Sequence, residues 1–580
     1  MDSIPVTLHE LLLARLDMLP SRLKTLAQEG AGVGRAFSLA LLAAVTGREE
    51  TDLRRELGGL VDAGLLLEER EGTDEPGYQF RHALFQEAAY QSLPRGERRR
   101  QHQRIARVLQ ERFPAVVEAK PEVLAHHHTS AGAPALALPY WCEAGKLALQ
   151  RRAIPEVVTY LTRAQELLRE LPEAERHPAV EVLVWAMQAC ALAHERGFDS
   201  PEAARTQARA LELLRRLDEF PPLLAVGLWS LHGYHQMRAE YDLARELAER
   251  VVRQGERQEN LELIAMGCHL LANDFACQGR ARLALESIER ARACESSGLA
   301  QNGKRAGAGQ VTSSPSASLA FASMGLSVLG RLEQARRSGR EAVEQARRSG
   351  HPPTTTVALS YTAMACQFRR DVQEASRYVE EAVALSSERS YWRWKVWERV
   401  LQGWTLAELG QPHEGLALLQ REIANWRQWE ARSTLTYFFG LLADVHLKLG
   451  QLREGLRVVQ EALSAGQATG ERFFEAELYR LRGELLRGMG QEREARYDFS
   501  RAIAVAREQE ALLFELRATV SLGRLPRDTG RPEVAPRLVT RVLTRFDAGE
   551  DSVDLMEARA LLEELSAEWG DRRGAEAVRE

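Results

Sequence analysis

Cysteine is scarce in this sequence, and no two cysteines form the close pair that binds zinc or makes a redox-active disulfide. The chain has 580 residues and six cysteines. Wide spacing of this kind is typical of thiols buried as small apolar groups in a reducing compartment. The sequence therefore favours a cytoplasmic location. The cysteines are Cys142, Cys190, Cys268, Cys277, Cys294 and Cys366.

Long apolar runs and targeting signals are also missing. Runs such as Leu39 to Val45 are far shorter than the roughly 20 residues that cross a bilayer. The first residues include Asp2, His9 and Glu10, where a secretory signal would need a basic end and an unbroken apolar core. We expect neither a membrane span nor a membrane partner.

Neither sign of charge is in large excess. Lys and Arg number 77 against 82 Asp and Glu, a net charge of −5. This balance removes the long-range attraction that a nucleic-acid binder usually shows, so we expect protein partners and no nucleic acid. Residues that favour strands are few outside one short stretch, and Leu, Ala, Glu and Arg dominate. The composition predicts an all-α protein.

A short turn recurs along the chain at intervals of about 40 residues. It consists of glycine, a polar residue, two variable residues, a position resembling glutamate and a small residue. Only one step departs from the period, because an excess of 11 residues falls between the second and third turns. The turns begin at Ala239, Gly279, Gly330, Arg370, Gly410, Gly450, Gly490 and Gly530.

Small residues accompany each turn, seven positions before it and twelve after it. Seven residues make nearly two helical turns, so these positions lie on the faces where two helices would cross closely. The pattern resembles the tetratricopeptide repeat, whose usual period is shorter. Those before the turn are Ala272, Ser323, Ala363, Gly403, Ala443, Gly483 and Gly523, and those after it are Ala291, Ala342, Ala382, Ala462 and Ala502.

The predicted fold is a right-handed superhelical array of tetratricopeptide-like helix pairs, with a period of about 40 residues. We place it at 114–565, clearest over 230–545. The excess residues fall at about 298–318, where Gly, Ser and Ala cluster, and we expect a mobile insertion there. Residues 566–580 are predicted to form a polar tail that frays. Partners are expected on the concave face, which is lined by the helices that precede each turn.

The first part of the chain, 1–113, has a different pattern. Segments 65–70 and 78–81 read as two strands that flank a turn, and short helices are expected at 8–18, 23–29, 38–45 and 51–63. Helices followed by a hairpin indicate a winged-helix-like domain. Such a fold binds DNA in some proteins and is an internal structural module in others.

Several stretches resemble the segment that follows the ATPase domain in bacterial signalling ATPases of the STAND class. They are IPVTLHELLLARLDMLP, FSLALLAAVTG, LVDAGLLLEER and YQFRHALFQEAAYQSL. Relatives of this kind fuse a protein kinase or nucleotide cyclase ahead of the ATPase and carry tetratricopeptide-like repeats behind it. The resemblance implies a non-catalytic, signal-sensing repeat region that acts on an ATPase in trans or upstream. A free-standing adaptor and a transcription regulator are the alternatives.

His82 is the residue that the resemblance singles out. Residues 78–84 occupy the place of the MHD motif of STAND proteins, in which a winged-helix histidine approaches the nucleotide phosphate. His82 matches this histidine, whereas Ala83 replaces the usual aspartate. The resemblance implies nucleotide sensing in trans for His82, and a packing role is the alternative.

Other motif-like strings favour ordinary structure, and we expect no catalytic residue, metal or cofactor. Gly298, Gly303 and Lys304 match a phosphate-binding loop in outline, but Arg305 stands where a Ser or Thr would hold magnesium. Three successive histidines at 126–128 cannot all face one ion from a helix. The arginine-rich segment 95–112 has an apolar stripe and is expected to form an amphipathic helix.

A tryptophan-rich segment precedes the turn at Gly410. Helical spacing places three of these tryptophans on one face, where we expect core packing. Trp392 points elsewhere, next to Lys395 and Arg399 in helical projection, and these three residues are the predicted partner-binding candidates. The core tryptophans are Trp394, Trp397 and Trp404.

Overall fold

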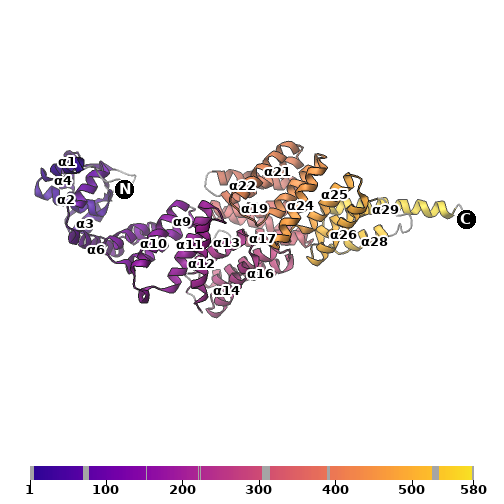
Figure 1. Cartoon of the computed structure of the whole chain (residues 1–580), viewed down its shortest axis with the longest axis horizontal. Helices are drawn as coiled ribbons and strands as arrows, with labels where there is room; N and C mark the ends of the chain where they lie inside the picture. The colour runs from indigo at the N-terminus through magenta and orange to yellow at the C-terminus, as the bar shows by residue number, and fades with distance from the viewer. Residues whose placement is uncertain are drawn as a thin grey trace. The chain divides into compact units, whose positions relative to one another are not determined.

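The structure is a computed structural model that describes residues 6–69, 77–151, 153–217, 219, 221, 224–302, 314–387, 392–525 and 534–577 (Figure 1). The chain divides into two compact units. One comprises residues 1–149 with 155–184, and the other comprises 150–154 with 185–580. Within the described ranges, none of the helices has the length and apolar character needed to cross a membrane.

The first unit begins with three helices and three strands in the order of a winged helix. The order is α2, β1, α3, α4, β2 and β3, and the strands form one antiparallel sheet in the order β1-β3-β2. Phe37 of β1 lies opposite Tyr78 of β3, and Leu66 of β2 lies opposite Phe80. The bounds are α2(Ser21–Val33), β1(Ala36–Ser38), α3(Leu39–Thr46), α4(Glu50–Asp62), β2(Leu66–Glu69) and β3(Gly77–Phe80).

The third strand, β1, was missing from the sequence prediction of a two-stranded hairpin. It has only three residues, too few to show the alternation that marks a strand. Ser38 ends the strand and caps the next helix, because its side chain accepts a hydrogen bond of 3.2 Å from the backbone nitrogen of Leu41.

Six further helices complete the described part of this unit. The arginine-rich segment forms the amphipathic helix expected of it, with Ile105 and Leu109 buried. The helices are α1(Val6–Asp17), α5(Ala83–Gln91), α6(Arg95–Arg112), α7(Pro114–Ala119), α8(Pro121–Ser130) and α9(Pro134–Gln150), and α10(Ile154–Glu170) follows in both units.

The second unit is an array of paired helices, as predicted. The first helix of each pair ends at a predicted turn and the second begins just after it. The first helices are α13(Ala225–Met237), α15(Leu261–Cys277), α17(Pro315–Val328), α19(Pro352–Arg369), α21(Trp392–Glu408), α23(Leu435–Lys448), α25(Glu475–Gly488), α27(Leu512–Gly523) and, at the end, α29(Val553–Ala577). The second helices are α14(Tyr241–Arg257), α16(Ala281–Asn302), α18(Leu332–Arg348), α20(Val372–Ser387), α22(Pro412–Gln428), α24(Leu452–Thr469), α26(Glu492–Glu508) and α28(Val534–Leu543). α11(Pro178–Arg196) and α12(Pro201–Arg215) precede them.

The predicted turns share one backbone conformation. Gly410 has φ 91°, Gly450 has φ 67°, and Arg370, which stands in place of glycine, has φ 60°. Ala239 adopts the same left-handed conformation at φ 60°. The repeat therefore imposes this turn even on residues with a side chain, which favour it less than glycine does. The turn expected at Gly530 falls outside the described residues.

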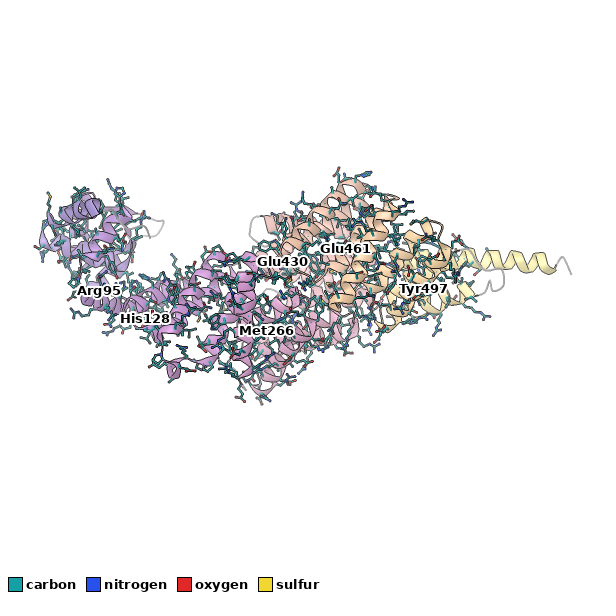
Figure 2. All side chains as sticks on the ribbon, in the orientation of Figure 1. Arg95, His128, Met266, Glu430, Glu461 and Tyr497 are labelled. Carbon is teal, nitrogen blue, oxygen red and sulfur yellow. The ribbon has the colours of Figure 1, made fainter. Side chains whose placement is uncertain are left out.

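The small residues lie where the paired helices cross, as the sequence predicted. A Cβ atom on Gly483 would lie 2.5 Å from Cε1 of Phe499 on the second helix of the same pair. A Cβ atom on Gly403 would lie 2.8 Å from Cγ of Leu419. Neither position has room for a side chain unless the helices move apart. Ion pairs such as that between Arg427 and Glu461, labelled in Figure 2, join successive second helices.

Two local predictions need correction. Most of the expected insertion at 298–318 is helical at its ends, because α16 continues to Asn302 and α17 begins at Pro315 with Ser314 as its cap. The residues between them, with Gly303 and Lys304 of the phosphate-loop-like string, lie outside the described ranges. The predicted polar tail is also helical as far as Ala577.

Candidate functional site

The array of the second unit coils so that turns far apart in sequence meet. The carbonyl oxygen of Met237 accepts hydrogen bonds from the backbone nitrogens of Arg432 and Ser433, at 2.8 and 3.1 Å. The carbonyl oxygen of Cys277 accepts in the same way from Arg472 and Phe473, at 2.9 and 3.1 Å. We call this line of contacts the seam.

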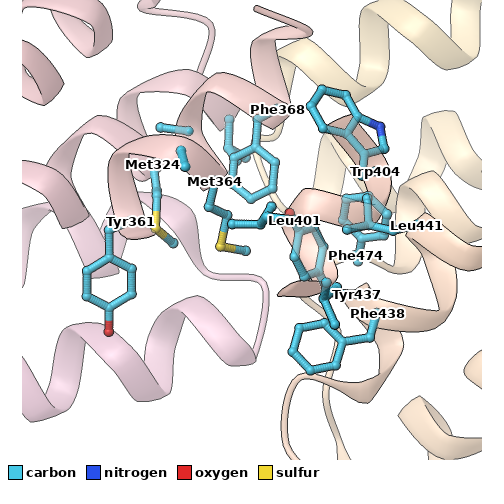
Figure 3. Close-up of a cluster of buried hydrophobic side chains, with 14 of the residues drawn as sticks. Met324, Tyr361, Met364, Phe368, Leu401, Trp404, Tyr437, Phe438, Leu441 and Phe474 are labelled. Atoms are coloured by element: carbon cyan, nitrogen blue, oxygen red, sulfur yellow. The ribbon is translucent and has the colours of Figure 1, made fainter. Parts of the chain in front are cut away.

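Aromatic side chains fill the centre of the face that the first helices present to one another. Phe368 of α19 lies with its ring centroid 6.0 Å from that of Phe514 of α27, although the two helices belong to separate pairs along the chain. Tyr437 and Phe474 join the same cluster, with centroids 5.1 Å apart (Figure 3). The predicted concave face is therefore packed at its centre, and open space remains beside the cluster.

The largest open space described is a cavity of about 250 Å³, which we call the charged cavity. It is lined by the first helices from α19 to α29. Trp404, Leu441 and Phe474 provide apolar lining beside the aromatic cluster. Its basic residues are Arg370, Lys448, Arg480, Arg487, Arg517 and Arg524, and its acidic residues are Glu408, Asp444, Glu477, Glu484, Asp554 and Glu557.

Arg517 connects opposite walls of the charged cavity. Its Nε and Nη2 atoms donate to the two carboxylate oxygens of Asp554, at 3.0 and 2.8 Å. Its Nη1 atom lies 3.5 Å from Glu477 on α25, and Nη2 also donates to the carbonyl oxygen of Phe368. One guanidinium group thus joins α19, α25, α27 and α29, using the fork geometry that pairs arginine with carboxylates.

The remaining charges form pairs around this centre. Arg480 donates to both carboxylate oxygens of Glu477 at 3.0 to 3.1 Å, and Nζ of Lys448 lies 3.1 Å from Glu408. Arg370 donates to Asp554 at 3.3 Å and to Glu557 at 2.8 Å. The lining is therefore a network in which most of the charges are already paired.

Burial does not discharge the arginines of this network. Burial lowers the pKa of Arg480, but Glu477, with smaller contributions from Glu484 and Asp444, outweighs it, and the net pKa lies above its usual value. Burial also opposes the charge on Arg517, and Asp554 and Glu477 raise its pKa above the ordinary value. Both groups stay cationic across the physiological pH range.

A smaller cavity of about 50 Å³ lies among α13, α15, α17 and α19. His232 and Met266, the latter labelled in Figure 2, are among its lining residues. Nε2 of His232 lies 2.9 Å from a carboxylate oxygen of Asp274, and burial raises the pKa of that carboxyl. The space holds little more than a water molecule or two, so this pair belongs to the packed interior.

The structure confirms the predicted core tryptophans, because Trp394, Trp397 and Trp404 are all buried. Helix α21 begins at Trp392, whose side chain is outside the described set. Lys395 is exposed, and Arg399 is half-buried and donates to Gln402 at 2.9 Å. Neither residue lines the charged cavity, so their role as partner contacts stays a prediction.

His82 is the N-cap residue of α5 and follows strand β3 directly. Its side chain is exposed, with the ring centroid 6.1 Å from that of Phe85. This placement leaves the predicted sensing role untested. In the histidine run, His127 and His128 are buried, which confirms the packing interpretation for these two residues. Nδ1 of His127 lies 2.8 Å from Nδ1 of His102.

Sequence reasoning missed the charged cavity, although the repeat carries a signal for it. Glu477, Arg517 and Glu557 are separated by the repeat length, and so are Asp444, Glu484 and Arg524. Charged residues at fixed places on the first helices indicate a polar stripe along one face of the array. The stripe becomes a cavity only because the array coils, and the period alone does not reveal that coiling.

No family model matches the chain. An uncharacterised protein of Rhizobium meliloti (strain 1021) is 24% identical over 466 residues, which cover 78% of this chain and 44% of the relative. The chain therefore spans less than half the length of this curated relative.

Solved structures share the repeat architecture. A Rap protein complexed with Competence and Sporulation Factor matches 65% of this chain and 99% of its own, with a TM-score of 0.48 and 12% identity. A STAND protein with a tetratricopeptide repeat sensor from Pyrococcus horikoshii matches 88% of this chain and 68% of its own, with a TM-score of 0.35 and 12% identity. This chain is an all-helical, tetratricopeptide-like repeat protein with a small three-stranded sheet in its N-terminal region.

Proposed function

We propose that the chain is a non-catalytic regulatory region that binds a peptide or an extended protein segment in the charged cavity. The cavity is the observation that carries this proposal. It offers polar groups from several first helices around an apolar wall, and a peptide needs both kinds of surface for its backbone and its side chains. The volume of about 250 Å³ suits a few side chains rather than a folded domain.

A ligand in this cavity would act on the whole array. The cavity lies where α19 meets α29, and its walls also include α23 and α25. A ligand that touches these walls together would favour the coiled arrangement over a looser one by its difference in affinity for the two. Binding would thereby be converted into a change in the stability of the seam.

The regulated partner in this proposal is a signalling ATPase of the STAND class, linked to a kinase or nucleotide cyclase. The support is the resemblance of the N-terminal segments to the region that follows such an ATPase. His82, exposed at the start of α5, would approach the nucleotide phosphate of that ATPase. An in-frame phosphate-binding loop in the DNA upstream of Met1 would support this linkage. Upstream DNA without one would favour a free-standing adaptor.

Panning a displayed library of random peptides on the immobilised chain tests ligand binding. Leu447 lines the cavity and is half-buried, so Leu447→Trp should fill part of the space. The matched control is Leu409→Trp, at a leucine that is 45% exposed and lies outside the lining. Peptides should be retained by the native chain and by the control, and lost from Leu447→Trp.

Two outcomes would contradict the proposal. Equal retention on Leu447→Trp would move the binding site away from the charged cavity. Failure to retain any peptide on the native chain would remove peptide binding itself. Lys395→Glu, at the exposed end of α21, tests the second predicted contact region, because loss of an ATPase partner in a binding assay is expected only if Trp392, Lys395 and Arg399 contribute.

A further inference from the structure

We infer that the charged cavity selects acidic peptides, whose carboxylates pair with the outward edges of its arginines. The inference rests on the proposed function and narrows it to one class of ligand. Counted by residue type alone, the cavity is neutral, so the selectivity comes from which charges reach the open space and which are already used.

In each ion pair of the cavity the cation is more exposed than the anion. The Glu484 side chain is 10% exposed and its partner Arg487 is 43% exposed. Asp554 is 2% exposed, whereas Arg370, which pairs with it, is 38% exposed. The surface that a ligand meets is therefore more basic than the composition of the lining indicates.

The deepest carboxylates have no free oxygen to offer a cationic ligand. Both oxygens of Asp554 accept from Arg517, and one also accepts from Arg370. Both oxygens of Glu477 accept from Arg480. A ligand cation could reach them only by breaking these pairs and leaving an arginine without its partner, which is costly in a buried site.

The arginines, by contrast, keep donors in reserve. Arg370 reaches its two carboxylates through Nη1, Arg524 contacts Glu557 through Nη2, and Arg487 contacts Glu484 through Nε and Nη2. No partner among the described residues takes Nη2 of Arg370 or Nη1 of Arg487 and Arg524. A guanidinium has only donors, so these free edges need acceptors, and a carboxylate fits them in the bidentate manner.

The apolar wall adds a second requirement. Phe474 and Trp404 lie beside these charges, and a Cβ atom on Gly440 would lie 2.6 Å from the ring of Phe474. The bare backbone at Gly440 lets the Phe474 ring lie directly against α23. An apolar side chain between two acidic residues of a peptide would contact this wall while its neighbours reach the arginines.

The test uses an equimolar library of hexapeptides in which each position holds Glu, Lys, Ser, Leu or Tyr. Peptides retained by the immobilised chain are eluted and identified by mass spectrometry. We expect Glu to be enriched over Lys, and the enrichment to fall at least about tenfold in the double variant Arg487→Gln with Arg524→Gln, since a hydrogen bond to a charged group commonly changes affinity by that factor.

Both substituted arginines are more than 40% exposed, at 43% and 42%, so the fold should survive. The double variant Arg487→Lys with Arg524→Lys keeps the charge and should retain part of the enrichment. Arg457→Gln, at a 68% exposed arginine on α24 outside the cavity, is the matched control and should leave the enrichment unchanged. Retention of Glu-rich peptides should also weaken as salt is added.

The outcomes separate this inference from the proposed function. Retained peptides that are Lys-rich or show no charge preference would overturn the inference and leave peptide binding in place. The absence of any retained peptide would overturn both. Binding of inorganic phosphate alone, measured by calorimetry and lost in the double glutamine variant, without Glu enrichment in the library, would also overturn the choice of an acidic peptide.

Discussion

Glu398 is a buried carboxyl whose ionisation should set part of the pH dependence of stability. It lies on α21 and its side chain is fully buried. Oε1 accepts from the hydroxyl of Ser360 at 3.3 Å, and Oε2 accepts from the hydroxyl of Ser386. Burial raises the pKa of Glu398 from 4.5 to about 8, although Ser386, Ser360 and the charge of Arg399 act in the other direction.

The sign follows from which state holds the proton. Between its unfolded and folded pKa values this carboxyl is protonated in the native chain and ionised in the unfolded one, so the free energy of unfolding falls as the pH rises. The stabilising contribution is fully present below the unfolded pKa and is lost as the pH rises through about 8. One pKa unit corresponds to about 1.4 kcal/mol, so the loss between about pH 5 and pH 8 is of order 3 kcal/mol.

Glu398→Gln keeps the shape and the hydrogen bonds to both serines but cannot ionise. Urea unfolding followed by circular dichroism should find the variant close to the native chain near pH 5 and more stable by about 3 kcal/mol near pH 8. Glu471, whose pKa burial raises to about 7, titrates in both proteins, so comparison at equal pH isolates Glu398. Glu344→Gln, at an exposed glutamate, is the control and should change little.

An equal loss of stability at both pH values would refute this reasoning. It would mean that Glu398 is ionised in the native chain, and that its hydrogen bonds outweigh the effect of burial.

Three further predictions concern packing, charge and nucleotide. Gly483→Phe should destabilise by more than the usual range of about 1 to 3 kcal/mol for an overpacked core, since Phe499 occupies the space of its side chain, and an unchanged thermal melt would remove the crossing assignment. Arg517→Met should cost about 3 to 5 kcal/mol by leaving the buried carboxylate of Asp554 without its main partner. A loss similar to that of an exposed arginine would show that the network is dispensable. Calorimetry should detect no binding of magnesium-ATP at micromolar concentrations, and binding abolished by Lys304→Ala would show that the phosphate-loop-like string is a real site.

The sequence by itself determined the parts of this protein that depend on neighbours along the chain. The period of about 40 residues, the left-handed turns and the small residues at Gly403 and Gly483 are local requirements of one helix pair, and they recur in every copy. The winged-helix helices and the hairpin strands were predicted for the same reason. Strand β1 escaped because three residues carry too little pattern.

The tertiary structure alone decided where the repeated surfaces meet. Each pair turns by a small angle relative to the one before it, and these angles add over several repeats before Met237 meets Arg432 or Arg370 meets Asp554. A period in sequence does not fix that angle, because it depends on how side chains pack between neighbouring pairs. The accumulated rotation filled the centre of the concave face with aromatic rings and left the charged cavity beside them, with Arg517 joining walls that are distant in sequence.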